Sequence, residues 1–102
     1  MTTPEGKVKQ RIKQVLNSAG AYHFWPVQQG YGNKTLDCLA CYKGHFIGIE
    51  AKAEGKHPSA LQSFTMRQIN EAGGKVFVID NEEGARDLKA YLETLGPIQH
   101  SG

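Results

Sequence analysis

The sequence predicts a single α/β domain with its elements in the order αβββαβα. Apolar residues recur at helical spacing in three segments, and runs rich in β-branched and aromatic residues lie between these segments. Two of the runs are separated by only two residues, which is typical of a β-hairpin. The chain has 102 residues, the size of one compact domain. We therefore expect one domain over residues 1–95 and a flexible tail over residues 96–102.

The first predicted helix has signals at both ends. Thr2 and Glu5 stand three residues apart with Pro4 between them, the pattern of a capping box with proline in the first helical turn. Apolar residues then recur at helical spacing over residues 8–19, and Gly20 is a typical helix stop.

Three strand-like runs follow, over residues 21–27, 36–42 and 45–52. Pro26 cannot donate a hydrogen bond to a neighbouring strand, so the first run is expected at a sheet edge or a bulge. Lys43 and Gly44 have the spacing of a two-residue turn between the second and third runs.

The rest of the chain predicts a helix, a strand and a closing helix. Ser59 is a suitable N-cap for a helix that ends at Gly73-Gly74, and the apolar arc of this helix is wide enough to imply burial on more than one side. The arc comprises Leu61, Phe64, Met66, Ile69 and Ala72. Residues 75–80 form a short apolar strand of the kind buried on both faces. Residues 82–95 form the last helix, with a core stripe of Ala85, Leu88, Tyr91, Leu92 and Leu95.

The composition is that of an ordinary soluble globular protein. Hydrophobic residues make up 39% and charged residues 22% of the chain, values typical of folded domains. The apolar runs are far shorter than the roughly 20 residues that cross a bilayer, and no signal-peptide core follows Met1, so we expect a cytoplasmic protein. The formal net charge of +2 permits contact with nucleic acid without arguing for it.

Basic residues are concentrated in the first predicted helix. Lys7, Lys9, Arg11 and Lys13 would suit a surface that contacts phosphates, and they would equally suit a solvated helix face. The glycine-containing loop over residues 28–34 and the loop before the second helix offer further candidates for contact with a DNA backbone. These are Tyr31, Asn33, Lys34 and His57.

An acidic residue two positions before a lysine is a weak signal because chance produces it. It occurs here in Glu5-Gly6-Lys7, Glu50-Ala51-Lys52, Glu54-Gly55-Lys56 and Asp87-Leu88-Lys89. Only one of these pairs gains a partner from the hairpin, because a turn at Lys43-Gly44 places Asp37 directly opposite Glu50. Opposed Cβ atoms lie about 4.5–5.5 Å apart, and Lys52 points to the same face as Glu50. We therefore expect Asp37, Glu50 and Lys52 to share one face of the sheet.

This juxtaposition has the chemistry of a divalent-metal site. Two carboxylates about 5 Å apart repel by roughly 3 kcal/mol at an effective dielectric constant near 20, and a cation would turn this repulsion into affinity. Hard oxygen ligands on a rigid strand pair suit Mg²⁺ or Mn²⁺, with the carbonyl of Ala51 and water completing the coordination. The ion would activate water and neutralise a scissile phosphate, while Lys52 orients or deprotonates the nucleophile. The alternative is a cross-strand ion pair on the surface, worth about 0–1 kcal/mol.

The order of these residues resembles the VRR-NUC family of the PD-(D/E)xK nuclease superfamily. The resemblance spans about Glu5 to Asp80 and rests on Glu5, Asp37, Glu50-Ala51-Lys52, Gln62 and the strand Val76-Phe77-Val78-Ile79. One departure is Leu36, which stands where the superfamily commonly has proline.

Membership would imply a restriction-endonuclease-like αβββαβ core with a C-terminal helix, in which helices flank a mixed sheet. It would also imply that Asp37 and Glu50 bind the metal, that Lys52 serves the attacking water, and that Gln62 and Glu5 support the site, Glu5 as a further metal ligand. The capping box explains Glu5 without catalysis, and Gln68 is the rival to Gln62.

Stand-alone members of this family, of phage or bacterial type, resemble Holliday-junction resolvases in forming homodimers that act on branched DNA. The resemblance therefore implies a homodimeric, structure-selective DNA endonuclease that depends on Mg²⁺ or Mn²⁺ and uses no small-molecule cofactor.

Two other interpretations need weighing. The order αβββα is also that of the double-stranded RNA-binding domain, a non-catalytic module, although such a module would not need the strand and helix after Gly74. Cys38 and Cys41 have the spacing of a redox or zinc motif. Residues three apart in a strand point to opposite faces, so we expect both to be small buried core residues.

Overall fold

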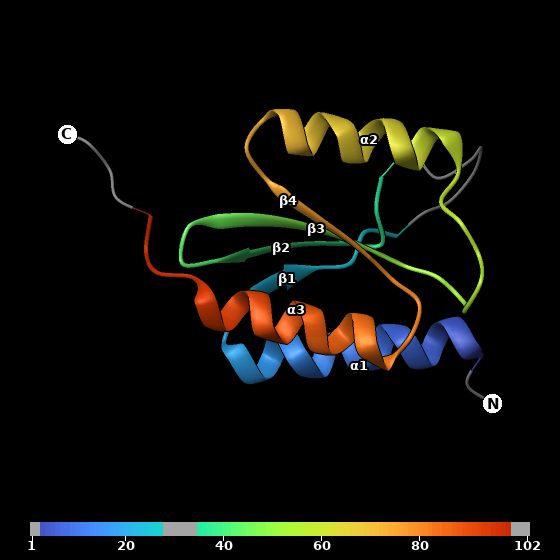
Figure 1. The fold of residues 1–102 in the computed structure, drawn as a ribbon, viewed down its shortest axis with the longest axis horizontal. Helices are drawn as coiled ribbons and strands as arrows, with labels where there is room; N and C mark the ends of the chain where they lie inside the picture. The colour runs from blue at the N-terminus through green and yellow to red at the C-terminus, as the bar shows by residue number, and fades with distance from the viewer. Residues whose placement is uncertain (1–2, 28–34, 99–102) are drawn as a thin grey trace.

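The computed structural model describes residues 3–27 and 35–98, and it contains every predicted element. The elements, shown in Figure 1, are α1 (Pro4–Ala19), β1 (Tyr22–Phe24), β2 (Cys38–Tyr42), β3 (His45–Ala51), α2 (Ala60–Glu71), β4 (Lys75–Ile79) and α3 (Glu82–Thr94). This is the order expected from the sequence. No described helix is long and apolar enough to span a membrane.

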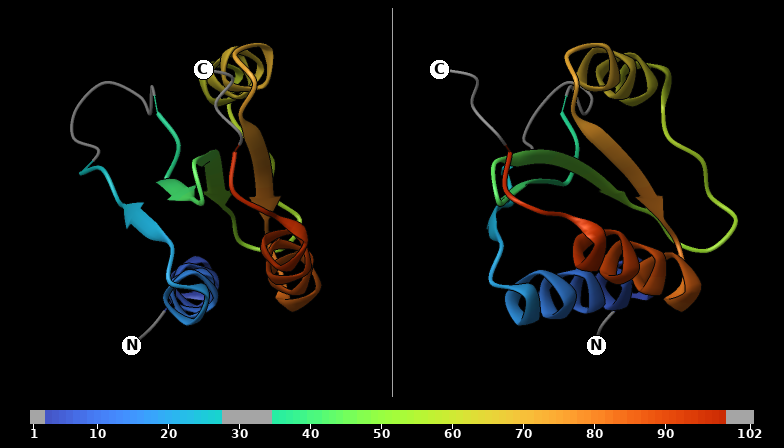
Figure 2. Two further views of the ribbon diagram at one scale, coloured as in Figure 1. Left: turned by 90° about the vertical axis from the view of Figure 1, so that its left-hand side faces the viewer. Right: turned by 60° about the vertical axis from the view of Figure 1, so that its left-hand side comes forward.

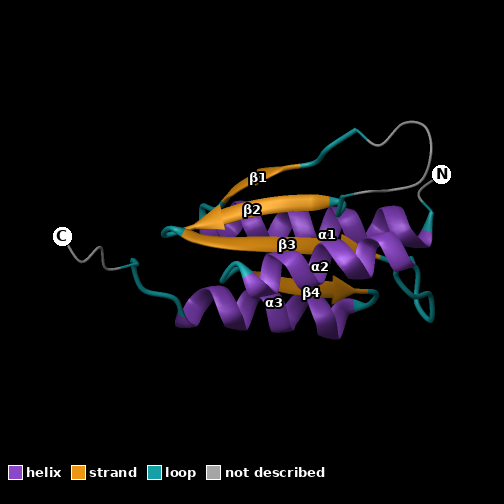
Figure 3. Ribbon diagram, turned by 90° about the horizontal axis from the view of Figure 1, so that it is seen from above, coloured by secondary structure: helices purple, strands orange, loops and turns teal. Residues whose placement is uncertain are grey.

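The strands form one mixed sheet in the order β1-β2-β3-β4. Strand β2 is antiparallel to β1 and β3, whereas β4 runs parallel to β3 because α2 makes the crossover between them. Figure 2 shows α1 and α3 on one face of the sheet and α2 on the other, and Figure 3 shows the strands side by side. Strand β1 lies at an edge and ends before Pro26, as predicted. The α/β fold with helices flanking a mixed sheet is confirmed.

The hairpin has the predicted two-residue turn. Lys43 and Gly44 have φ angles of 52° and 86°, and positive φ at both positions is what a type I′ turn requires. Tyr42 pairs with His45, and the same register continues to the pair of Cys38 with Ile49. By the same count Asp37, the residue just before β2, comes opposite Glu50, and its backbone N–H donates to the Glu50 carboxylate.

The hydrophobic core lies between the sheet and the helices α1 and α3. Its buried helical members are Ile12, Val15, Leu16, Ala85, Leu88 and Leu92. Its buried members from the strands are Cys38, Ala40, Ile47, Ile49, Ala51 and Ile79. The predicted core stripe of the last helix is confirmed, since Tyr91 and Leu95 also pack against this cluster.

The start of α1 differs from the prediction by one residue. Thr3, and not Thr2, is the N-cap, and its side chain accepts a hydrogen bond from the backbone N–H of Gly6. Pro4 therefore occupies the first helical position, where the helix has no use for the N–H that proline lacks. Glu5 is then the second helical residue rather than the third. The predicted capping box is wrong, and it does not explain Glu5.

Two elements are more exposed than predicted. Helix α2 fully buries only Gln62, and Leu61 and Phe64 are 49% and 53% exposed. Strand β4 lies at the sheet edge, with Val78 44% exposed. Burial of α2 on more than one side and of β4 on both faces is therefore wrong. The physical reason is visible in Figure 2, where α2 rests on one face of the sheet and turns its far side away from the other described elements.

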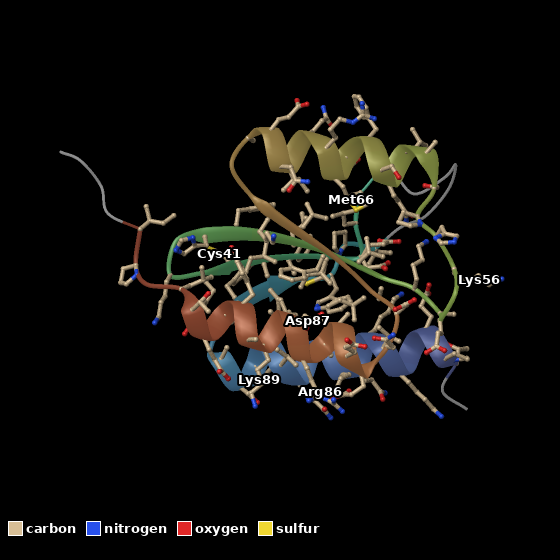
Figure 4. All side chains as sticks on the ribbon, in the orientation of Figure 1. Cys41, Lys56, Met66, Arg86, Asp87 and Lys89 are labelled. Atoms are coloured by element: carbon tan, nitrogen blue, oxygen red, sulfur yellow. The ribbon has the colours of Figure 1, made fainter. Side chains whose placement is uncertain are left out.

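The close packing of α2 on β3 depends on Gly48. A Cβ atom at this position would lie 2.8 Å from Leu36 Cδ1 and 3.0 Å from Ile69 Cδ1, too close for either side chain to stay in place. Figure 4 labels Met66, whose sulfur atom lies on the sheet-facing side of α2. The absence of a side chain at Gly48 thus brings α2 against the strand that carries Glu50.

Residues 96–98 are held against the hairpin rather than frayed. The carbonyl oxygen of Gly96 lies 2.7 Å from Nε2 of His45, and the backbone N–H of Ile98 donates to the carbonyl of Lys43 at 3.2 Å. The remainder of the predicted tail, residues 99–102, lies outside the described residues.

Candidate active site

Asp37 precedes β2 and Glu50 lies near the end of β3, and the two carboxylates are held by each other's strand. The backbone N–H of Asp37 donates to Glu50 Oε1 at 3.0 Å, and the backbone N–H of Ala51 donates to Asp37 Oδ2 at 2.9 Å. Each carboxylate is therefore fixed through one oxygen. Lys52 Nζ lies 3.0 Å from the other oxygen of Glu50, Oε2. The structure brings together the three residues that the hairpin register predicted.

Glu50 is an acid in an unfavourable position. Its side chain is 1% exposed, and a buried carboxylate is costly unless it is paired. Burial raises the pKa of the Glu50 carboxyl above its ordinary value, the hydrogen bond from Lys52 lowers it, and the negative charge of Asp37 raises it again. Perturbed acids of this kind are concentrated at functional sites. A surface ion pair, the alternative interpretation, would not be buried in this way.

The carboxylates open into a cleft of about 410 Å³. It is lined by Glu5, Lys9, Lys13, Trp25, Pro26, Asp37, Glu50 and Lys52. Three of these side chains are acidic and three are lysines, so their formal charges cancel. The cleft combines hard oxygen donors with ammonium groups that can face a phosphate.

One stripe of α1 forms a wall of the cleft. Glu5, Lys9 and Lys13 follow one another at intervals of four residues, which places them on the same side of the helix. Lys9 Nζ lies 3.6 Å from Glu5 Oε2 and 3.7 Å from Asp37 Oδ1. Lys13 Nζ lies 4.8 Å from the centre of the Trp25 ring.

The residues that sequence reasoning missed at this wall are Trp25 and Pro26. Trp25 is most simply interpreted from the sequence as a core or dimer-interface residue and Pro26 as a sheet-edge residue, but both line the cleft just beyond the end of β1. The four-residue spacing of Glu5, Lys9 and Lys13 was the available signal that one face of the first helix belongs to the site.

The other two basic residues of α1 face elsewhere. Arg11 Nε lies 3.0 Å from both carboxylate oxygens of Glu82 in α3. Lys7 lines a separate hollow beside Arg11, Asn81 and Glu82. Both positions lie on a different helical stripe from Lys9, which is why the predicted basic surface is divided between two sides of the helix.

The predicted loop contacts are not part of the described cleft. Tyr31, Asn33 and Lys34 lie outside the described residues. His57 is exposed in the loop before α2 and is not among the described residues that line the cleft.

The predicted set of three carboxylate ligands is not assembled. Over residues 3–27 and 35–98, no group of three His, Cys, Asp or Glu side chains lies close enough to hold a metal ion. Glu5 lines the cleft, but the ammonium of Lys9 lies between its carboxylate and Asp37. The carboxylate donors that the strands bring together are those of Asp37 and Glu50.

Gln62 is buried as predicted, but its oxygen has a local partner. The side-chain Oε1 accepts a hydrogen bond from the backbone N–H of Ser59 at 2.9 Å, and the backbone N–H of Gln62 donates to Ser59 Oγ at 3.1 Å. This capping box explains the burial of Gln62 without catalysis. Gln68 lines a different hollow, between α2 and Phe46. Neither glutamine lines the described cleft.

The other acid-and-lysine pairs in α3 and in the loop before α2 do not contribute to the cleft. Figure 4 labels Lys56, which extends outward from the loop, and Asp87 and Lys89, which lie on α3. None of these three residues lines the cleft.

The cysteines do not form a redox or zinc site. Cys38 is buried, Cys41 is exposed, and both are free thiols. They lie on opposite faces of β2 as predicted, but Cys41 is not a core residue, because its face of the strand is open near the hairpin. Burial raises the pKa of Cys38 to about 12, so this thiol stays protonated and unreactive at neutral pH.

The fold matches a solved structure described as a VRR_NUC domain. The two superimpose with a TM-score of 0.76 at 22% sequence identity, over 88% of this chain and 98% of the other. No protein-family model and no curated protein matches the sequence. The chain therefore has the fold of a VRR_NUC domain, and the resemblance noted in the sequence is confirmed for the fold.

Proposed function

We propose that this chain is a VRR-NUC nuclease that hydrolyses phosphodiester bonds in DNA with the help of a divalent metal ion. The observation that carries the proposal is the meeting of Asp37, Glu50 and Lys52 in one cleft of a chain with the VRR_NUC fold. Glu50 is buried and Asp37 is partly exposed, and both carboxylates line the cleft, where a cation can reach them.

The donor set fits Mg²⁺ or Mn²⁺. Asp37 Oδ1 and Glu50 Oε2 are the carboxylate oxygens that face ammonium groups rather than backbone N–H donors, and the carbonyl of Ala51 is the further hard oxygen that the sequence predicts. A divalent ion held there would lower the pKa of a bound water and neutralise charge on the phosphate. Hard oxygen ligands favour these ions over zinc or copper.

The residues of the chain supply positioning and charge. Lys52 stays beside Glu50 and is placed to orient the water that attacks the phosphorus atom. The backbone donors of Asp37 and Ala51 hold both carboxylates still, so the site needs little rearrangement during the reaction. Lys9 and Lys13 stand at the wall of the cleft, where they can face the DNA backbone.

We infer a preference for branched DNA and a homodimeric state, as the resemblance to junction resolvases implies. Two-fold symmetry would supply one site for each strand of a junction. Support comes from apolar side chains that a partner would cover, because Tyr22 and Phe24 on β1 and Leu61 and Phe64 on α2 are all about half or more exposed. We place the enzyme in the cytoplasm of a bacterium or of a phage-infected host.

The rival interpretation, a non-catalytic double-stranded RNA-binding module, finds no support. Strand β4 pairs with β3 along its whole length, from Ile47 with Lys75 to Ala51 with Ile79. Helix α3 contributes Ala85, Leu88 and Leu92 to the core. The two elements that such a module would not need are therefore integral to this fold.

The experiment is an incubation of the purified protein with four-way junction, flap, nicked and linear duplex DNA, in Mg²⁺, in Mn²⁺ and in EDTA. We expect metal-dependent cleavage, fastest on the branched substrates. The Glu50→Gln protein serves as the matched control for a contaminating nuclease. Cleavage that persists at the full rate in Glu50→Gln, or in EDTA, would contradict the proposal, and binding of duplex RNA without any cleavage would favour the rival module.

A further inference from the structure

We propose that Lys9 is an exchangeable counterion of the metal site, one that neutralises Asp37 in the metal-free protein and competes with the incoming divalent ion. This inference rests on the proposed function, because it concerns the same pair of carboxylates. It assigns to Lys9 a role toward the metal, in addition to the phosphate contact that the first helix suggests.

The ammonium of Lys9 lies where a cation would bind Asp37. Ala51 donates to Asp37 Oδ2, and Lys9 Nζ faces the other oxygen, Oδ1, at 3.7 Å. The same ammonium lies 3.6 Å from Glu5 Oε2. Lys9 therefore bridges the carboxylates of Glu5 and Asp37, and it faces the Asp37 oxygen that accepts no hydrogen bond from the backbone of the described residues.

The charge balance of the cleft favours the departure of a positive group when a metal binds. The lining residues carry three carboxylates and three ammonium groups. A divalent ion adds two positive charges to this neutral set, and an ammonium within 4 Å of the ion would repel it strongly. Movement of one lysine away from the carboxylate that it faces would relieve this repulsion.

Lys9 is the lysine best able to move. Lys52 is 16% exposed and lies 3.0 Å from a carboxylate that is 1% exposed, so its departure would leave a buried acid unpaired. Lys9 is 34% exposed, and both of its contacts exceed hydrogen-bond length. Lys13 faces the Trp25 ring, and within residues 3–27 and 35–98 its ammonium forms no ion pair with Asp37 or Glu50.

The test is the affinity of the DNA-free protein for Mn²⁺, measured by electron paramagnetic resonance of the free ion. We compare the wild type with Lys9→Met, which keeps the length of the side chain without its charge. Lys13→Met is the matched control, because it removes the same charge from the same cleft without removing a contact to Asp37. Lys9→Gln is a second neutral variant, and Lys9→Arg keeps the charge.

We expect Lys9→Met and Lys9→Gln to bind Mn²⁺ about twofold to fivefold more tightly than the wild type, the range for removing a partly exposed ion pair of this kind. Lys13→Met should change the affinity less, and Lys9→Arg should stay close to the wild type. Equal affinities of Lys9→Met and Lys13→Met, or weaker binding by Lys9→Met, would overturn the inference while leaving the proposed function standing. Failure of the wild type and of every variant to bind Mn²⁺ would overturn both.

Discussion

The backbone N–H of Asp37 donates to the carboxylate of Glu50 at 3.0 Å, and the carboxylate of Asp37 accepts from the residue after Glu50, Ala51, at 2.9 Å. This reciprocal pair exists only in the observed register of β2 and β3. A slip of one residue would turn Asp37 to the opposite face of the sheet and break both hydrogen bonds. The hairpin turn at Lys43-Gly44 is therefore as important to the site as the acids themselves.

Substitution of either acid should abolish cleavage without unfolding the protein. We expect Asp37→Asn and Glu50→Gln each to lower the rate of DNA cleavage by about 100-fold or more, because each removes a charged metal ligand. Both amides keep an oxygen that can accept the existing backbone hydrogen bond. Rates are measured on a labelled four-way junction in Mg²⁺, with circular dichroism to verify folding.

The matched control for this loss is Asp87→Asn, which removes an acid at the same spacing from a lysine on the exposed side of α3. Its cleavage rate should equal that of the wild type within about twofold, as for most surface substitutions. An equal loss of activity in Asp87→Asn would show that the cleavage rate falls because the protein is destabilised, and not because a metal ligand is lost.

The metal-free protein should become less stable as the pH rises above the ordinary range of a glutamate. The native state raises the pKa of Glu50 from its ordinary value of 4.5, so the native state binds this proton more tightly than the unfolded state does. The resulting stabilisation is complete below about pH 4.5 and is lost as the pH rises through the raised pKa. Urea unfolding in EDTA should therefore show the wild type losing stability relative to Glu50→Gln over this window. A constant difference between the two proteins, or one that changes in the opposite direction, would contradict the assigned burial of Glu50.

Much of the fold could be predicted because its signals are local. The turn at Lys43-Gly44, the N-cap at Ser59 and the helical spacing in the last helix depend only on neighbouring residues, and all three are confirmed. The position of Asp37 opposite Glu50 followed from counting back from that turn.

Features that depend on packing were harder to predict. The apolar arc of α2 predicts burial on more than one side, but among the described elements α2 packs against one face of the sheet, and Phe64 stays exposed. The assignment of Lys9 to the cleft and of Arg11 to Glu82 depends on which side of α1 faces the strands and which side faces α3. Trp25 reaches the cleft from beyond the end of β1, where strand periodicity gives no information.

Basic residues of α1 should contribute unequally to DNA binding. Lys13 lines the cleft, whereas Lys7 lies beside α3. We expect Lys13→Gln to weaken binding of a four-way junction and to reduce the slope of log K against log salt concentration by about one, the effect of losing one phosphate contact. Lys7→Gln, which removes the same charge from the same helix, should leave the slope unchanged. Fluorescence anisotropy in EDTA at several salt concentrations measures both, and equal slopes for the two variants would argue against the cleft as the DNA-binding face.

Gly48→Ala should destabilise the protein by about 1–3 kcal/mol, the usual cost of overpacking. The added Cβ would meet Leu36 Cδ1 and Ile69 Cδ1 at 3.0 Å or less, so both side-chain ends must shift within the contact between α2 and β3. Gly96→Ala is the control, because a Cβ there meets nothing within 4 Å. Thermal unfolding followed by circular dichroism should show a lower Tm for Gly48→Ala alone. Equal Tm values for the two variants would show that α2 does not pack on β3 this closely.

The most direct test of the site is a titration with Mn²⁺, in the absence of DNA, of the wild type, Asp37→Asn and Glu50→Gln. Isothermal titration calorimetry measures the binding. If the two acids hold the ion together, the wild type shows saturable binding, and each single substitution weakens it by about tenfold or more. Binding that is unchanged in both variants would contradict a metal site at the meeting of β2 and β3.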